Sequence, residues 1–211
     1  KDKDIFEQTK KFNSGIRLYM FQTGTIKTKL KFIKMNHTDE PYEIPVPWFL
    51  IKHPEGDVII DGGMPIEAAI DKHKHWGSVV EAYDPVMKTS EWCRDQVKTV
   101  NTNPDDVKHV IQTHLHLDHS GAIGHFPNAT HITQKLEYDY AFNPDWFSSP
   151  AYIRADFDKP NIRWKFLQGR KTDFYDVYGD GVIKIIFTPG HTPGHQSVLV
   201  NLPKTGHMLF T

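Results

Sequence analysis

Apolar and polar side chains alternate with the period of β-strands over much of this chain. In residues 26–32 apolar or hydroxyl side chains alternate with three lysines, which is the pattern of a strand with one face in water. The apolar run "IRLYMFQ" precedes it, and Thr23 and Gly24 between the two predict a hairpin turn. "VPWFLIKH" and "DVIIDGG" predict two further strands, joined by a turn at "PEG".

Helices and strands follow one another without a regular repeat in the rest of the chain. "SEWCRDQVKTV" predicts a helix that Ser90 caps and that buries Cys93, Val97 and Val100 on one face. Asn103 and Pro104 predict a helical turn before the strand "KHVIQTH". Later strands are predicted at "THITQ", "WKFLQG", "GVIKIIFT", "QSVLVNL" and "HMLFT". Short strands in hairpins, with helices between some of them, indicate sheets covered by helices.

The length of 211 residues fits one domain with an N-terminal extension. Residues 1–15 are polar, with a helix conceivable through "DIFEQTKKF", so we expect the domain to span residues 16–211. A formal net charge of −1 argues against nucleic acid or an anionic membrane as a partner and fits a small, weakly charged substrate. No stretch has the ~20 apolar residues of a membrane span, and the charged start is unlike a signal peptide, so the expected location is the cytoplasm.

The densest concentration of chemically active side chains is "THLHLDHSG", directly after the predicted strand "HVIQT". His114 and His116 are two positions apart near the strand end, so their neutral imidazoles could chelate one cation. Asp118 and His119 could hold a second. Imidazole with carboxylate suits zinc and similar metals, whereas magnesium or calcium requires more oxygen ligands. Because Cys93 is the only cysteine, a thiolate zinc cluster and an internal disulfide are both excluded.

Two other segments carry candidate site residues. "TPGHTPGHQS" follows the predicted strand "IKIIF", and Gly190 lets the backbone turn so that His191 could complete the nitrogen ligands of the first metal. His195 is expected to make a structural hydrogen bond beneath the site. Asp61 ends the apolar run "VIID" and is either a turn carboxylate or an acceptor that holds a ligand histidine.

The motif "HLHLDH", the downstream "TPGHTPGH" and the upstream "DGG" together resemble the metallo-β-lactamase superfamily over about residues 16–211. The resemblance implies an α/β fold, an αββα sandwich of two mixed sheets flanked by helices, with two metals in loops at one sheet edge. "IPVPWFLI", "IIDGGMP", "NPDDVKHVIQTHLHLDHSGAIG", "FPNATHI" and "TPGHTPGHQSVLV" are similar to the N-acyl homoserine lactonases of that superfamily. This similarity implies that His114, His116 and His191 hold the first metal and that Asp118 and His119 belong to the second.

The activity that this resemblance implies is quorum quenching, the opening of the lactone ring of N-acyl homoserine lactones. Two divalent metal ions, expected to be zinc although iron, manganese or cobalt use the same ligands, would share a hydroxide that attacks the lactone carbonyl. Asp118 would pass a proton to the leaving oxygen. Met64, Trp76 and Leu117 lie in or beside segments that match pocket-lining regions of the lactonases, with core packing as the alternative for each. "DWFSSPAYI" could form part of a lid or of a homodimer surface.

The family also has a bridging aspartate soon after the strand that "HMLFT" begins, and a last histidine ligand nearer the C-terminus. We expect both beyond Thr211, and we interpret His207 as a hairpin residue and not as their substitute. One alternative keeps the site and changes the substrate to γ-butyrolactone, a thioester or an organophosphate ester. The other alternative is a non-catalytic scaffold protein, against which the intact ligand positions argue.

Overall fold

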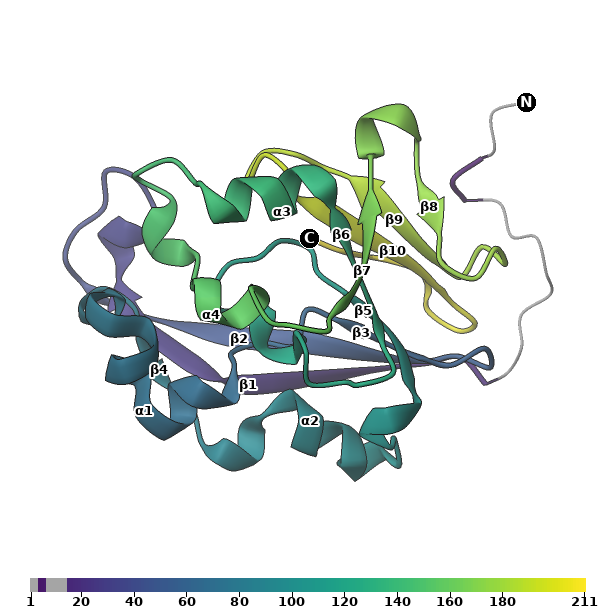
Figure 1. Cartoon of the computed structure of the whole chain (residues 1–211), viewed down its shortest axis with the longest axis horizontal. Coiled ribbons are helices and arrows are strands. Elements are labelled where there is room, and N and C mark those ends of the chain that lie inside the picture. The colour runs from purple at the N-terminus through teal and green to yellow at the C-terminus, as the bar shows by residue number, and fades with distance from the viewer. Residues whose placement is uncertain (1–3, 7–14) are drawn as a thin grey trace.

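Two stacked β-sheets form the framework of the computed structural model, which describes residues 4–6 and 15–211 (Figure 1). The larger sheet has the strand order β4-β1-β2-β3-β5-β6-β7 and the smaller one β11-β10-β9-β8. The bounds in the larger sheet are β1 Arg17–Lys29, β2 Pro41–Lys52, β3 Asp57–Ile60, β4 Asp84–Val86, β5 Val107–Ile111, β6 Thr130–Gln134 and β7 Arg163–Leu167. In the smaller sheet they are β8 Tyr175–Asp176, β9 Ile183–Phe187, β10 Gln196–Leu202 and β11 Gly206–Phe210.

The helices are short and lie outside the sheet pair. They are α1 Ile66–Trp76, α2 Cys93–Gln96, α3 Lys135–Phe142 and α4 Arg154–Phe157. In Figure 1, α1 and α2 lie on one side of the larger sheet and the smaller sheet lies on the other. The expected sandwich is therefore confirmed, with one difference in detail. The larger sheet is mixed, with β3, β5, β6 and β7 parallel to one another, whereas the described strands of the smaller sheet all pair antiparallel.

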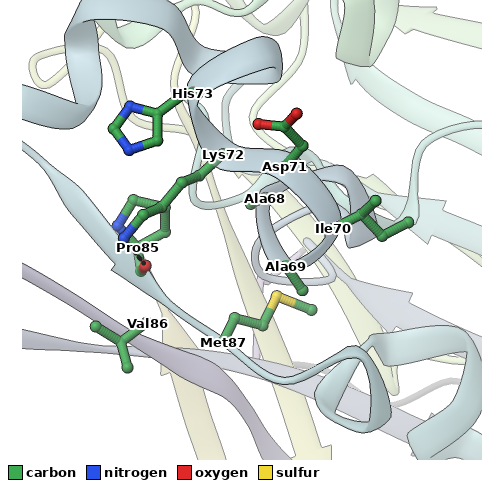
Figure 2. A pocket seen from close by; sticks show the side chains of 9 residues that line it. All are labelled: Ala68, Ala69, Ile70, Asp71, Lys72, His73, Pro85, Val86 and Met87. Atoms are coloured by element: carbon green, nitrogen blue, oxygen red, sulfur yellow. Dashed lines mark hydrogen bonds between the residues drawn. The ribbon is translucent and has the colours of Figure 1, made fainter.

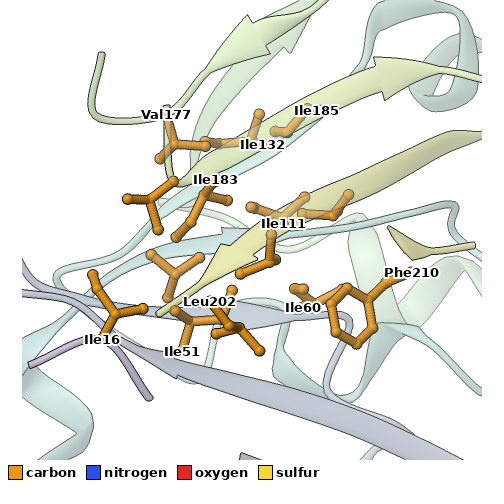
Figure 3. Close-up of a cluster of buried hydrophobic side chains, with 14 residues drawn as sticks. Ile16, Ile51, Ile60, Ile111, Ile132, Val177, Ile183, Ile185, Leu202 and Phe210 are labelled. Carbon is orange, nitrogen blue, oxygen red and sulfur yellow. The ribbon is translucent and has the colours of Figure 1, made fainter. Parts of the chain in front are cut away.

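The main hydrophobic core fills the space between the two sheets (Figure 3). Isoleucines are its commonest residue type, among them Ile51, Ile60 and Ile111 from the larger sheet and Ile183 and Ile185 from the smaller one. Burying one such side chain contributes about 1.5–3 kcal/mol. All seven residues of β10 are buried, as expected for a strand covered on both faces.

The predicted hairpin turn at Thr23 and Gly24 is wrong. β1 continues through both residues, and its pairing with β2 shifts register there, as in a β-bulge. Gly24 has φ +79°, and a Cβ on it would lie 2.1 Å from the carbonyl oxygen of Val86 in β4. A bulge and a hairpin turn both select glycine at positive φ. Gly24 therefore marks a break in the regular strand, but the break is a bulge and not a turn.

The predicted helix cap at Ser90 is also wrong. Ser90 lies inside a 3-10 turn, and the chain is extended at Trp92 (ψ 136°) before α2 begins. The indole nitrogen of Trp92 donates to the carbonyl oxygen of Gly121 at 3.3 Å, and this packing interrupts the helix. Cys93 and Val97 are buried as predicted, whereas Val100 is only partly buried. Burial raises the pKa of the Cys93 thiol.

The helical turn predicted at Asn103 and Pro104 is present, and the Asn103 side chain accepts a hydrogen bond from the backbone N–H of Asp105. β4 and β8, of three and two residues, were not predicted, because such short strands carry no alternation pattern.

The helix predicted through "DIFEQTKKF" lies largely outside the described residues, and the division at residue 15 stays a prediction. Of the described part, the backbone oxygen of Ile5 accepts a hydrogen bond from Lys184 Nζ at 2.5 Å, and Phe6 meets the ring of His207 edge-on. His207 lies in β11 and pairs with Asn201 across the β10–β11 hairpin, as expected. Among the described helices, none is long and apolar enough to cross a membrane.

A polar seam joins the two sheets at the end of β5. The backbone N–H of Gln196 donates to the carbonyl oxygen of Thr113 at 2.9 Å, and its side-chain amide donates to the carbonyl oxygen of Gln112 at 2.8 Å. Gln134 donates to the side-chain oxygen of Gln196 at 2.7 Å. Leaving one of these buried groups without its partner would lower the stability of the fold by about 1–3 kcal/mol. Arrangements of the two sheets that break these bonds are therefore disfavoured.

A buried histidine of β6 should make the protein sensitive to mild acid. Burial lowers the pKa of His131 to about 4, and its Nε2 accepts a hydrogen bond from the N–H of Gly124. Between about pH 6.5 and 4 the unfolded chain therefore binds more protons than the folded one, and stability falls as pH falls. His131→Gln keeps an acceptor, and we expect it to reduce this loss by up to about 3 kcal/mol in denaturant unfolding at pH 7 and pH 4.5.

The matched control for that experiment is His37→Gln, because His37 is exposed and its change should leave the pH dependence as it is. If His131→Gln loses as much unfolding free energy between pH 7 and pH 4.5 as the unaltered protein does, His131 is not the cause of the acid sensitivity.

Candidate metal centre

The first histidine loop leaves the larger sheet at the end of β5, where neighbouring parallel strands also end. Strand pairing stops at Ile111, two residues earlier than the sequence suggested. His114 is buried, at 3% exposure, and His116 is half-buried. Loops at the carboxyl edge of parallel strands are common places for sites, because several of them meet there.

The second histidine loop connects β9 to β10 and brings His191 to the first. One nitrogen each of His114, His116 and His191 lies within 4.8 Å of the others, and His191 Nε2 is 3.2 Å from His116 Nδ1. The structure thus brings together the three histidines expected for the first metal, although they come from two different sheets.

These three imidazoles fit a divalent metal ion. Burial is the main cause that lowers the pKa of all three, to about 3 for His116, so the rings are neutral near pH 7. The Nε2 atoms of His114 and His116 are buried and have no hydrogen-bond partner among the described residues. Neutral imidazole nitrogens with free lone pairs are the donors that zinc and similar metals bind.

Asp118 and His119 form a second, charged group next to these rings. His119 Nε2 lies 3.5 Å from Asp118 Oδ2, and His119 Nδ1 lies 2.8 Å from Asp61 Oδ2. Burial disfavours the charged imidazole, but the two carboxylates outweigh burial and raise the pKa of His119 well above its usual value. Asp61 also accepts hydrogen bonds from the backbone and hydroxyl of Thr113. Asp61 therefore contacts His119, and its role in holding a metal-ligand histidine stays a prediction.

His195 is fixed from below by its own loop. Its Nδ1 lies 3.1 Å from the carbonyl oxygen and 3.0 Å from the hydroxyl of Thr188, which agrees with the expected structural hydrogen bond. A cleft of about 470 Å³ opens over this group. Its lining residues are His114, His119, Thr188, His191, His195, Ser197, Leu209 and Thr211.

The three residues expected in the substrate pocket lie together in the core. Met64, Trp76 and Leu117 belong to one cluster and are 0%, 3% and 5% exposed. This placement matches the core-packing alternative, and contact with a substrate stays a prediction. Of "DWFSSPAYI", Trp146 and Phe147 are strongly exposed.

A separate hollow of about 440 Å³ lies between α1 and β4 (Figure 2). None of its lining residues is a predicted site residue, and Lys72 at its wall forms an ion pair with Asp84. The hollow therefore has no part in the metal centre.

Sequence reasoning missed Glu137 and Tyr152, which contact the histidine loops. Glu137 is fully buried, and the Tyr152 hydroxyl donates to it at 3.1 Å. The ring of Tyr152 meets that of His116 edge-on, with 4.7 Å between centroids. A glutamate in the first turn of a helix is commonplace, so its sequence position alone gave no signal.

A two-sheet sandwich with a histidine cluster at the strand ends is the architecture of a metal-binding enzyme, and residues 41–211 match the sequence profile of the metallo-beta-lactamase superfamily. The chain belongs to this superfamily and, within it, to the family of the N-acyl homoserine lactonases. N-acyl homoserine lactonase AttM of Rhizobium radiobacter is 58% identical to it over 199 residues, which are 94% of this chain and 76% of that protein.

More distant relatives agree with this assignment. An N-acyl homoserine lactonase of Bacillus sp is 32% identical over 92% of this chain and 74% of its own length. A solved structure of an N-acyl homoserine lactone hydrolase, with the product N-hexanoyl-L-homoserine at its catalytic metal centre, has a TM-score of 0.78 and 28% identity. The match covers 91% of this chain and 73% of that one.

Removing one of the clustered imidazoles should weaken metal binding. We expect His191→Ala to lower the affinity for the first zinc ion at least about tenfold, because it deletes one of three nitrogen donors. Competition with a chromophoric chelator measures this affinity. His207→Ala, which alters a histidine of the β11 hairpin, serves as control and should bind zinc like the unaltered protein. Equal affinity in both variants would contradict the assignment of His191.

Proposed function

We propose that this chain opens the lactone ring of N-acyl homoserine lactones by metal-dependent hydrolysis. The observation that carries the proposal is the convergence of three neutral imidazoles from two sheets, with unpartnered buried nitrogens, at one sheet edge. The 58% identity to an N-acyl homoserine lactonase over 94% of the chain supports the same substrate class. The net charge of −1 is consistent with a small, weakly charged lactone and not with nucleic acid.

The proposed cofactor is a pair of divalent ions, with zinc as the expected metal. His114, His116 and His191 would hold the first ion, and Asp118 and His119 would belong to the second. Asp61 would orient His119, and His195 would support the site from beneath. When bound, such ions polarise a carbonyl group and make water acidic enough to supply a nucleophile near neutral pH.

Asp118 is the residue to which we assign proton transfer. Burial alone would raise its pKa, but His119 outweighs burial and lowers the pKa to about 2, so the side chain is ionised near pH 7. An ionised carboxylate can accept the proton of the attacking water and return it to the oxygen that leaves when the ring opens. In this proposal Asp118 is the catalytic residue of the chain.

The acyl chain of the substrate requires apolar surface beside the cleft. Leu117 directly follows His116, and its backbone N–H donates to the carbonyl oxygen of Ala151 at 2.9 Å. We therefore place the acyl chain near this loop, with Leu117, Trp76 and Met64 as its proposed contacts. The exposed Trp146 in the same stretch as Ala151 supports a lid or a homodimer surface there. The proposed location of the protein is the cytoplasm.

Ring opening of N-hexanoyl-homoserine lactone, followed with a pH indicator, tests the activity. We expect turnover by the metal-replete protein and its loss after chelation, with recovery on adding zinc. Asp118→Asn should lower kcat by about 10²–10⁴-fold, the usual contribution of general acid–base catalysis. Bound metal is measured in parallel, because Asp118 also belongs to the proposed second ion site. Asp105→Asn, an exposed change distant from the cleft, is the control.

Substrate class is decided by comparison under the same conditions. γ-Butyrolactone, a thioester and an organophosphate ester are assayed beside the acylated lactone. Undetectable ring opening of the acylated lactone by protein of verified metal content, together with rapid cleavage of another ester, would refute the proposed substrate.

A further inference from the structure

One buried carboxylate is bound to both histidine loops. Glu137, in the first turn of α3, is fully buried. It accepts a hydrogen bond from the N–H of Leu115 at 2.9 Å and one from the hydroxyl of Thr192 at 2.5 Å. The hydroxyl of Tyr152 also donates to it at 3.1 Å. All three partners are donors, so a carboxylate at this position is satisfied without a positively charged side chain.

The positions of these donors connect them directly to the metal ligands. Leu115 lies between His114 and His116 in the first loop, and Thr192 follows His191 in the second. The Glu137 side chain therefore connects the two loops. One of its carboxylate oxygens accepts from Leu115 and the other from Thr192.

The packing around Glu137 leaves the second loop little freedom. A Cβ built on Gly194 would lie 2.1 Å from the backbone nitrogen of Glu137 and 2.3 Å from its Cα, so the loop lies directly against the first turn of α3. Glycine is required at this close approach. The hydroxyl of Tyr152 meets the same carboxylate oxygen as Leu115 does, while its ring contacts His116.

We propose that Glu137 is a positioning residue that fixes the His191 loop against the His114–His116 loop and thereby preorganises the three-nitrogen metal site. It acts through the backbone and the Thr192 hydroxyl, and none of its hydrogen bonds reaches an imidazole. The inference rests on the metal site of the proposed function but not on the identity of the lactone. Loss of a group that orients metal ligands typically weakens metal affinity 10–100-fold.

Zinc affinity of the metal-free protein, measured by chelator competition, tests this role. Glu137→Gln places an amide group where an acceptor is needed, and Thr192→Val removes one donor only. We expect both to bind the first zinc ion about 10–100-fold more weakly than the unaltered protein. Thr192→Ser keeps the hydroxyl and should restore affinity. The double variant should bind no more weakly than Glu137→Gln alone, because both changes break the same hydrogen bond.

The matched control is Thr102→Val. Thr102 is also a buried threonine, and its hydroxyl donates to the carboxylate of Asp57 at 2.9 Å. Asp57 lies at the start of β3, at the opposite end of the strand from Asp61 and the histidine loops. This change should lower the melting temperature without changing zinc affinity, which separates general loosening from loss of positioning.

The outcomes are distinct. Zinc affinity within twofold of the unaltered protein in Thr192→Val and Glu137→Gln would overturn the role of Glu137 and leave the metal site intact. A loss in Thr102→Val as large as that in Thr192→Val would overturn it too. If Glu137→Gln does not fold, Thr192→Val decides, because Glu137 then keeps two of its three donors. Absence of zinc binding in the unaltered protein would refute the metal site of the proposed function itself.

Discussion

The hydrogen bond from the N–H of Gln196 to the carbonyl oxygen of Thr113 is the constraint on which the site depends. Apolar contacts press the two sheets together, but they are non-directional and allow many relative orientations. A buried hydrogen bond between the first residue of β10 and the residue before His114 allows few. The carbonyl oxygen of Gln112 and the side-chain amide of Gln134, both bonded to Gln196, extend this seam, so sliding of one sheet over the other would leave several buried polar groups unpaired.

The electrostatics of the centre follow from this enforced proximity. Five histidine rings lie close together, and burial keeps His114, His116, His191 and His195 neutral by lowering their pKa values. His119 alone among them is favoured as a cation, because it lies between the carboxylates of Asp118 and Asp61. Two unpartnered nitrogens in the same place lower the stability of the metal-free fold, and a bound cation would remove that cost.

Local signals predicted much of the fold and the ligand set, and their failures have physical causes. Alternation located the long strands and the buried β5, and the density of "HLHLDH" identified the first loop as a ligand-bearing one. Gly24 was misassigned because a bulge and a turn both require positive φ. Ser90 was misassigned because the side-chain packing of Trp92, a tertiary interaction, overrides the capping preference. How closely His191 approaches His116 depends on the stacking of the sheets, which no local pattern contains.

Glu137 shows what topology adds to such local signals. β6 pairs in parallel with β5, so the helix that follows β6 begins at the same sheet edge as the loop that follows β5. A carboxylate in the first turn of that helix is thereby brought near backbone N–H groups of the neighbouring loop, whatever its surroundings in sequence. Its partners are a backbone N–H and the hydroxyls of two residues far away in the sequence, so composition and motif could not reveal them. Once the strand order is known, however, a buried acid at the start of a helix beside a metal-binding loop is a position worth testing as an orienting group, because the fold supplies the proximity and the sequence only the charge.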